Sequence, residues 1–121
     1  MLLVAAGTYA NSVPNGFAYD DNTIIVGRSL VTDGRAVEAL TSAYWPQAVS
    51  GSGLYRPVTL SSFALQWRLW NGNPAGFHVV NLVAHAAVSL LVFFLILQVS
   101  TLLPALVGGV LFAVHPVHSE A

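Results

Sequence analysis

The sequence has no cysteine and no lysine, and charged side chains make up only 7% of its 121 residues. The missing cysteine excludes a disulfide framework and a Cys-based zinc site. Four arginines stand against five acids, which gives a net charge of −1 and excludes the basic surface that nucleic-acid binding needs. A water-soluble domain usually carries about 25% charged residues. The shortage of charge therefore excludes an ordinary soluble surface for the whole chain.

The few charges are also unevenly placed along the chain. Eight of the nine lie between Asp20 and Arg68, and residues 69–119 contain no Asp, Glu, Lys or Arg. Within that stretch, residues 77–99 have neither a charge nor a proline. About 20 apolar residues suffice for a helix to cross roughly 30 Å of hydrocarbon. The sequence therefore predicts a transmembrane helix over 77–99.

Two shorter apolar segments lie on either side of this helix in the sequence, one at the start of the chain and one shortly after residue 99. Residues 1–12 are predicted to be the end of a truncated first transmembrane helix, with a short interfacial anchor as the alternative. Residues 104–121 are predicted to start a further transmembrane helix, also truncated. Pro104 suits its first turn, where the missing N–H would be unpaired in any case.

Residues 13–76 form a long loop that glycines and prolines interrupt, and short amphipathic helices are expected at 36–44 and 59–70. The second has Thr59 or Ser61 as its N-cap and Asn71-Gly72 as its stop. Its aromatic side favours a helix lying in the membrane interface, with packing on a protein partner as the alternative; the residues are Phe63, Trp67 and Trp70. The predicted fold class is an all-α membrane protein, a transmembrane helical hairpin preceded by a long irregular loop with short interfacial helices.

The polar residues of the apolar stretch are concentrated at one end of the predicted hairpin. His78, Asn81 and His85 share one face of the first helix, and the returning helix ends with a second group, His115, His118 and Glu120. A hairpin would bring both groups to the side of the loop. Such residues either bond to neighbouring helices or face a wet cavity. A metal site at the second group is a further alternative.

Four sequence blocks together resemble one enzyme family over essentially the whole chain. They are NGFAYDDNTIIVG, GLYRPVTLSSFAL, NPAGFHVVNLVAHAAVSLLVF and LFAVHPVHSEA, in that order. They resemble the N-terminal portion of the GT-C membrane glycosyltransferases, and the transmembrane and tetratricopeptide-repeat O-mannosyltransferases with their bacterial relatives are the nearest match; the chain would be a truncated bacterial relative.

The resemblance implies an inverting transfer of a sugar from a polyprenyl-phosphate donor to an acceptor hydroxyl. Asp20 or Asp21 would be the general base, because attack by a hydroxyl requires a positioned carboxylate, and Glu120 would be a second acidic residue. Tyr55 and Arg56 would bind the donor, with the guanidinium on its phosphate. The remaining polar residues would line the substrate cavity: His78, Asn81, His85 and His115. No cofactor and no metal are expected.

The resemblance also sets the expected surroundings of the chain. Loop 13–76 would lie on the extracytoplasmic side of a bacterial inner membrane. The expected partners are the lipid bilayer, the lipid-linked sugar and other transmembrane helices, with no nucleic acid. Because the family builds its site from many spanning helices, a chain of this length is expected to be inactive alone. The alternative is a non-catalytic accessory subunit at the periphery of a respiratory, photosynthetic or similar membrane complex.

Overall fold

The computed structural model describes residues 2–46 and 54–115, and all regular structure within them is helical. The elements in chain order are α1 (Leu2–Tyr9), a 3-10 turn (Ala10–Ser12), a π-helical turn (Asn22–Val26), α2 (Ser29–Thr32), α3 (Ala36–Ala39), α4 (Pro57–Trp70), α5 (Pro74–Val99) and α6 (Leu102–Val114). The helical class predicted from the sequence is confirmed for these residues.

The chain divides into two compact units, each with its own internal packing. One unit is built from Met1–Asn15 and His78–Ala121, and the other from Gly16–Phe77. We call them the helical unit and the loop unit. Helix α5 belongs to both, because its first turn lies in the loop unit and the rest in the helical unit.

The helical unit is dominated by α5, whose 26 residues carry no charge. It is the one helix in the described ranges that is long and apolar enough to cross a membrane. Only 6% of its most apolar window is buried by the rest of the chain. Because few of its apolar side chains are covered here, α5 is suited to contact lipid or further helices, as the sequence predicted for 77–99.

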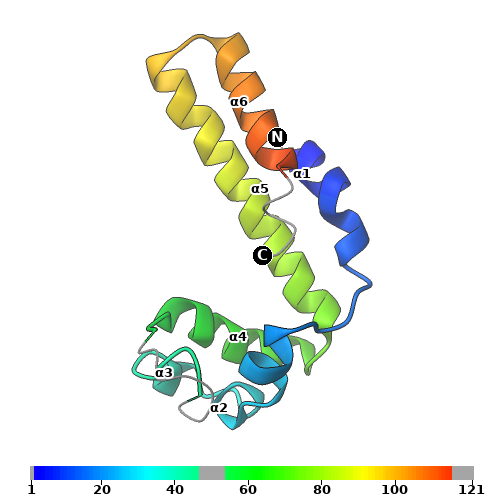
Figure 1. Ribbon diagram of the computed structural model, residues 1–121, viewed down its shortest axis with the longest axis vertical. Coiled ribbons are helices and arrows are strands. Elements are labelled where there is room, and N and C mark those ends of the chain that lie inside the picture. Colours follow the sequence, from blue (N-terminus) through cyan, green and yellow to red (C-terminus); the bar gives the residue numbers. More distant parts are fainter. Residues whose placement is uncertain (1, 47–53, 116–121) are drawn as a thin grey trace. The chain divides into compact units, whose positions relative to one another are not determined.

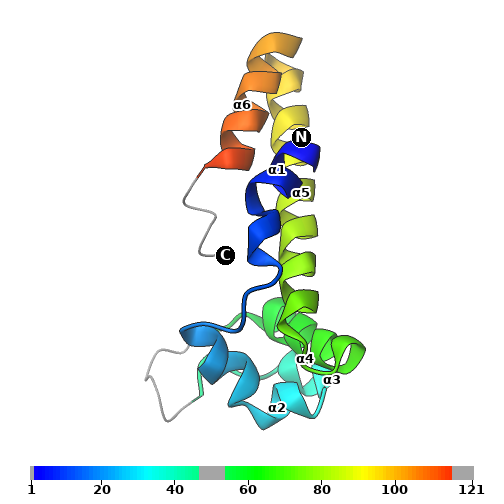
Figure 2. The same cartoon turned by 90° about the vertical axis from the view of Figure 1, so that its right-hand side faces the viewer.

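Helix α6 lies along the C-terminal half of α5 (Figures 1 and 2), and small residues make the close approach possible. A Cβ on Gly108 would lie 2.5 Å from Cδ1 of Ile96, so a larger residue there would have to displace the end of the Ile96 side chain. Ala105, Gly109 and Ala113 are buried at i, i+4 and i+8 of α6. Pro104 lies in the first turn of α6, as predicted, although the helix begins at Leu102.

The loop unit has a hydrophobic core of its own, formed where α4 packs on α2 and α3. The buried members are Ile24, Ile25, Val31, Ala39, Leu60 and Phe77. The ring of Phe77 contacts two other aromatic rings, and its centroid lies 5.2 Å from that of Phe17 and 6.1 Å from that of Phe63. The long loop is therefore a folded unit, although it contains few regular elements.

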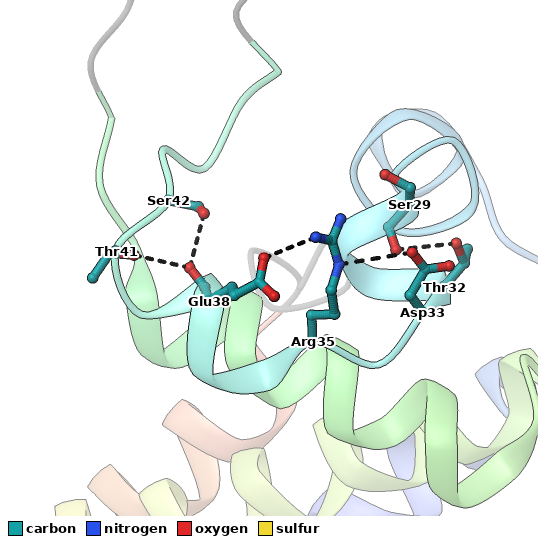
Figure 3. Close-up of polar contacts among 7 residues, drawn as sticks. All are labelled: Ser29, Thr32, Asp33, Arg35, Glu38, Thr41 and Ser42. Atoms are coloured by element: carbon teal, nitrogen blue, oxygen red, sulfur yellow. Dashed lines mark hydrogen bonds and ion pairs between the residues drawn. The ribbon is translucent and has the colours of Figure 1, made fainter.

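The turn between α2 and α3 fits closely against α4. Gly34 adopts φ +69, and a Cβ on it would lie 2.2 Å from Cγ of Arg68. The position therefore requires glycine for both its backbone angle and its space. Figure 3 shows Arg35 nearby between two carboxylates, with 2.8 Å to Glu38 and 3.7 Å to Asp33. These groups are exposed, so the ion pairs contribute little to stability.

The structure corrects three local predictions about this unit. Helix α4 begins at Pro57 with Arg56 as N-cap and no side-chain cap bond, so neither Thr59 nor Ser61 is the cap. Proline is well suited to a first helical position because it has no N–H to leave unpaired. The helix expected over 36–44 is shorter, since α3 ends at Ala39. The predicted stop of α4 is confirmed, because Asn71 has left-handed φ 50.

The aromatic side of α4 is the third correction. Phe63 and Trp67 pack against the core of the loop unit, and Leu60 and Ala64 are fully buried beside them. Only Trp70 of the three aromatic residues belongs to the exposed class. The face that the sequence assigned to the membrane interface is thus mainly an internal packing face.

Candidate functional site

The two predicted carboxylates lie in a tight turn at the start of the loop unit. Tyr19, which precedes them, is 94% exposed and has φ +43, an unusual angle for a bulky residue. The N–H of Asp21 donates to the Ala18 carbonyl at 2.9 Å, and Asp21 Oδ2 accepts the Ala18 N–H at 3.3 Å. The side chain of Asp21 therefore helps to close the turn.

Asp20 differs from its neighbour in both exposure and bonding. It is exposed, and within the described part of the chain its carboxylate has no hydrogen bond or ion pair. Strained backbone angles often accompany functional positions, and Tyr19, directly before this carboxylate, has such an angle. Of the two acids, Asp20 is the one available to take a proton from a bound hydroxyl.

Arg56 lies over the face of Tyr44, with its guanidinium carbon 5.1 Å from the ring centroid. Stacking of this kind fixes the plane of the guanidinium and leaves its N–H edges available for an anion. The backbone of Tyr44 is itself held in place, because its N–H donates to the Leu54 carbonyl at 2.8 Å. Arg28 also donates to the carbonyls of Tyr44 and Ala43, at 2.6 and 2.7 Å.

The electrostatics of Tyr44 connect the arginine to the carboxylates. Burial raises the pKa of the Tyr44 phenol, while the charge of Arg56 and a hydrogen bond with it act in the opposite direction. The negative charges of Asp20 and Asp21 raise the pKa further. Tyr44 is thus close enough to feel all three groups. Burial lowers the pKa of Arg28. The guanidinium of Arg28 is the group that donates to the carbonyls of Tyr44 and Ala43.

Tyr44 was not among the residues predicted from the sequence. It lies in an irregular stretch after α3, with no motif around it, and it precedes Arg56 by twelve positions. Tyr55, which was predicted to bind the donor, is 58% exposed and its hydroxyl donates to the Leu40 carbonyl. The structure therefore gives Tyr44 the contact with Arg56, and gives Tyr55 a bond to the end of α3.

A separate polar group lies in the helical unit, at the C-terminal end of α6. His85 Nε2 is 3.0 Å from the Ala113 carbonyl, which can only accept, so Nε2 carries the proton. The Tyr9 hydroxyl donates to the His115 carbonyl at 2.7 Å, and the rings of Tyr9 and His85 meet edge to face at 5.2 Å. Residues from α1 and α5 thus hold the last carbonyls of α6.

The remaining predicted residues lie in different surroundings. His78 Nε2 is buried and has no hydrogen-bond partner among the residues that the structure describes, whereas Asn81 is exposed. Glu120 and His118 lie outside the described residues. No group of three potential metal ligands occurs within residues 2–46 and 54–115. The structure therefore gathers Asp20, Asp21 and Arg56 in the loop unit, and His85 with His115 in the helical unit.

Comparison with known proteins gives several relatives that match nearly the whole chain. Protein O-mannosyl-transferase Tmtc1 of Drosophila melanogaster is 40% identical over 121 residues, which cover 93% of this chain and 14% of that protein. Protein O-mannosyl-transferase F38B6.6 of Caenorhabditis elegans is 32% identical, over 93% of this chain and 18% of that protein. Human protein O-mannosyl-transferase TMTC4 is 33% identical, over 97% of this chain and 18% of that protein.

Its homologues are the TMTC-type protein O-mannosyl-transferases. The resemblance drawn from the four sequence blocks is thereby confirmed. The chain spans less than a fifth of the length of each of the three TMTC-type relatives described above. No family model and no solved structure matches it. These relatives are animal proteins, and the bacterial inner membrane stays a prediction.

Proposed function

We propose that this chain contributes part of the active site of a GT-C-type protein O-mannosyl-transferase, which moves mannose from a polyprenyl-phosphate donor to a protein hydroxyl. The similarity to named transferases over 93% of the chain supports the reaction class. The observation that carries the site assignment is the Arg56 guanidinium stacked on Tyr44, whose phenol pKa is also raised by the negative charges of Asp20 and Asp21. Acid–base chemistry and phosphate recognition need these two kinds of group.

In the proposed reaction, the acceptor oxygen attacks the anomeric carbon of the donor and its proton passes to Asp20. The bond between that carbon and the phosphate oxygen breaks, and the polyprenyl phosphate leaves with the bonding electrons. Asp20 is the preferred base because its carboxylate is exposed and has no bonding partner among residues 2–46 and 54–115, while Asp21 holds the turn. A positioned base of this kind contributes about 10²–10⁴-fold in rate.

Arg56 would bind the donor phosphate as the negative charge on the leaving group grows. The Tyr44 ring beneath it orients the guanidinium, so that two N–H groups can point at two phosphate oxygens. A lysine could supply the charge but not this paired geometry. Tyr55 would support the same region through its bond to the Leu40 carbonyl.

The apolar helices would hold this site at a membrane. In this proposal α5 and α6 form a transmembrane hairpin, and the loop unit lies on the extracytoplasmic side with other transmembrane helices completing the cavity. His78 and Asn81 would line that cavity, and His85 would fix the end of α6, from which the segment containing Glu120 continues. The named relatives are transferases, which favours this reading over a non-catalytic accessory subunit.

The test is a transfer assay on the full-length gene product in membranes, with polyprenyl-phosphate mannose and a serine- or threonine-containing peptide. The double variant Asp20→Asn/Asp21→Asn and the single variant Arg56→Gln should each lose activity. The matched controls Asp33→Asn and Arg35→Gln remove the same kinds of group from the exposed ion pairs of the loop unit, and should keep it. Absence of mannosyl transfer by the parent protein, or full activity of the double variant, would overturn the proposal.

A further inference from the structure

The guanidinium of Arg28 holds a distant part of the loop unit by its backbone. Arg28 is half-buried, and its two terminal nitrogens donate to successive carbonyls, Nη1 to Tyr44 at 2.6 Å and Nη2 to Ala43 at 2.7 Å. These acceptors lie 16 and 15 positions further along the chain. Within the described residues Arg28 forms no ion pair with a carboxylate. Both ends of its planar fork are therefore used to fix the segment around Tyr44.

Arg28 is itself fixed by the chain on both sides of it. It is the N-cap residue of α2, and its carbonyl accepts the N–H groups of Val31 at 2.9 Å and Thr32 at 3.0 Å. Directly before it, the Gly27 N–H donates to the Asn22 carbonyl at 2.8 Å and closes the π-helical turn. A Cβ on Gly27 would lie 3.0 Å from that carbonyl oxygen, so the turn is tight. The side chain of Arg28 therefore starts from an ordered backbone.

The same piece of chain carries the two carboxylates. Asp20 and Asp21 directly precede the π-helical turn, and six residues separate Asp21 from Arg28. Ile24 and Ile25, within the turn, are each 2% exposed and belong to the core of the loop unit. A turn that is anchored in a close-packed core moves little relative to it. The carboxylates and Arg28 therefore belong to one anchored piece of the loop unit.

On the other side, Arg28 bonds to the residue that orients Arg56. The guanidinium carbon of Arg56 lies 5.1 Å from the centroid of the Tyr44 ring, and the Tyr44 N–H donates to the carbonyl of Leu54, two positions before Arg56. The described residues around Tyr44 form neither helix nor strand. Backbone groups in such a segment need partners outside regular structure, and Arg28 supplies one of them to the Tyr44 carbonyl.

We propose that Arg28 is a positioning residue, which sets the separation between the Asp20 carboxylate and the Arg56 guanidinium by holding Tyr44. The inference rests on the proposed function, because it takes Asp20 as the base and Arg56 as the phosphate ligand. In an inverting transfer the acceptor oxygen and the leaving phosphate lie on opposite faces of the anomeric carbon. The base and the phosphate ligand must therefore stand at a fixed separation, and a misplacement of about 1 Å can cost about 10²-fold in rate.

The first experiment measures KM for polyprenyl-phosphate mannose and for the acceptor peptide, with the full-length gene product in membranes. Arg28→Gln loses the fork that bridges two carbonyls, and should raise the donor KM several-fold while the peptide KM stays unchanged. Arg28→Lys keeps the charge without the fork, and should raise the donor KM by less. The control Arg35→Gln removes an arginine from the exposed ion pairs and should change neither value. A purely structural role would lower the amount of active enzyme without this selective change.

A double variant tests whether Arg28 acts through Tyr44. Tyr44→Leu removes the ring beneath Arg56, and Arg28→Gln in that background should raise the donor KM no further. A rise that multiplies in the double variant would overturn the inference, as would a parent-like donor KM in both Arg28 variants. If Arg56→Gln leaves the donor KM unchanged, or the parent transfers no mannose, the proposed function itself is refuted.

The second experiment measures the separation directly and does not depend on activity. Spin labels at Ala18→Cys and Val58→Cys, both exposed positions, report the distance between the carboxylate turn and the start of α4. The sequence has no cysteine of its own, and any in the rest of the full-length product are replaced. Arg28→Gln should broaden the distance distribution, and a distribution as narrow as that of the parent would overturn the inference. If tryptophan fluorescence shows Arg28→Gln to be unfolded, Arg28→Lys decides both experiments by the same criteria.

Discussion

Replacing the two neighbouring acids separately distinguishes a catalytic carboxylate from a structural one. Asp20 is exposed and makes no bond in the described chain, so Asp20→Asn changes its charge without disturbing the fold. Loss of a general base lowers turnover by about 10²–10⁴-fold. At about 1.4 kcal/mol for each tenfold change, the activation free energy rises by about 3–5 kcal/mol. The effect should appear in kcat, with KM for the lipid donor little changed.

Asp21 should respond in a different way. Its Oδ2 accepts the Ala18 N–H at 3.3 Å, a long bond that the amide oxygen of asparagine can also accept. Asp21→Asn should therefore lower turnover by less than tenfold, on the order of 1 kcal/mol. Asp21→Ala removes the acceptor, and should cost about 0.5–1 kcal/mol of folding stability. All three tryptophans of the sequence lie within the loop unit, so their fluorescence reports its unfolding directly.

The measurement is mannosyl transfer by the full-length gene product, with kcat and KM determined for each variant and tryptophan fluorescence used to confirm folding. An Asp20→Asn enzyme with unchanged kcat would refute the assignment of the base. So would the reversed pattern, in which Asp21→Asn is inactive and Asp20→Asn is not. Equal and large losses in both variants would show that the two carboxylates act as a pair, against the division of roles described above.

Three further predictions follow from the packing. Gly34→Ala should destabilise the loop unit by about 2–4 kcal/mol, from the left-handed backbone and the clash with Arg68, and tryptophan fluorescence during thermal unfolding measures it. When Gly34→Ala is made in an Arg68→Ala variant, only the part of the stability loss that comes from the left-handed backbone should remain. An equally large loss of stability in that variant would show that the clash with Arg68 does not contribute. His85→Gln keeps an N–H for the Ala113 carbonyl, whereas His85→Leu does not, so hydrogen exchange in the last turn of α6 should rise only with leucine. Gly108→Val should weaken the packing of α6 on α5 by about 1–3 kcal/mol. Unfolding by denaturant in detergent measures this loss, and Val107→Leu, a change at an exposed position of the same helix, is the control that should leave stability unchanged.

Several features were predictable because they depend on composition or on a short local sequence. The absence of charge over residues 77–99 predicts an apolar helix whatever packs beside it, and α5 covers all of this range. Asn71-Gly72 predicts a helix end, because both residues adopt positive φ at little cost. Pro104 predicts a first helical turn for a similar local reason. The order of the four blocks was sufficient to predict the family.

Other features depend on contacts between distant residues and could not be read from the sequence. The aromatic side of α4 looks suited to an interface, but Phe63 and Trp67 pack against Phe77, which comes ten or more residues later. The pairing of Arg56 with Tyr44 depends on how the stretch after α3 returns to the start of α4. The bond from His85 to the end of α6 depends on helix–helix register, which a polar stripe alone does not determine.

The distribution of charge explains why the proposed chemistry falls on the loop unit. Ionised groups are costly inside a bilayer, and the described residues after Arg68 contain no Asp, Glu, Lys or Arg. His85 uses its Nε2 proton on the Ala113 carbonyl, so that nitrogen cannot accept a proton from a substrate while the bond holds. The charged groups of Asp20 and Arg56 make no bond to the backbone of the residues that the structure describes. A transferase that acts on a lipid-linked donor can then combine charge-free helices for anchoring with a folded loop that supplies the base and the phosphate ligand.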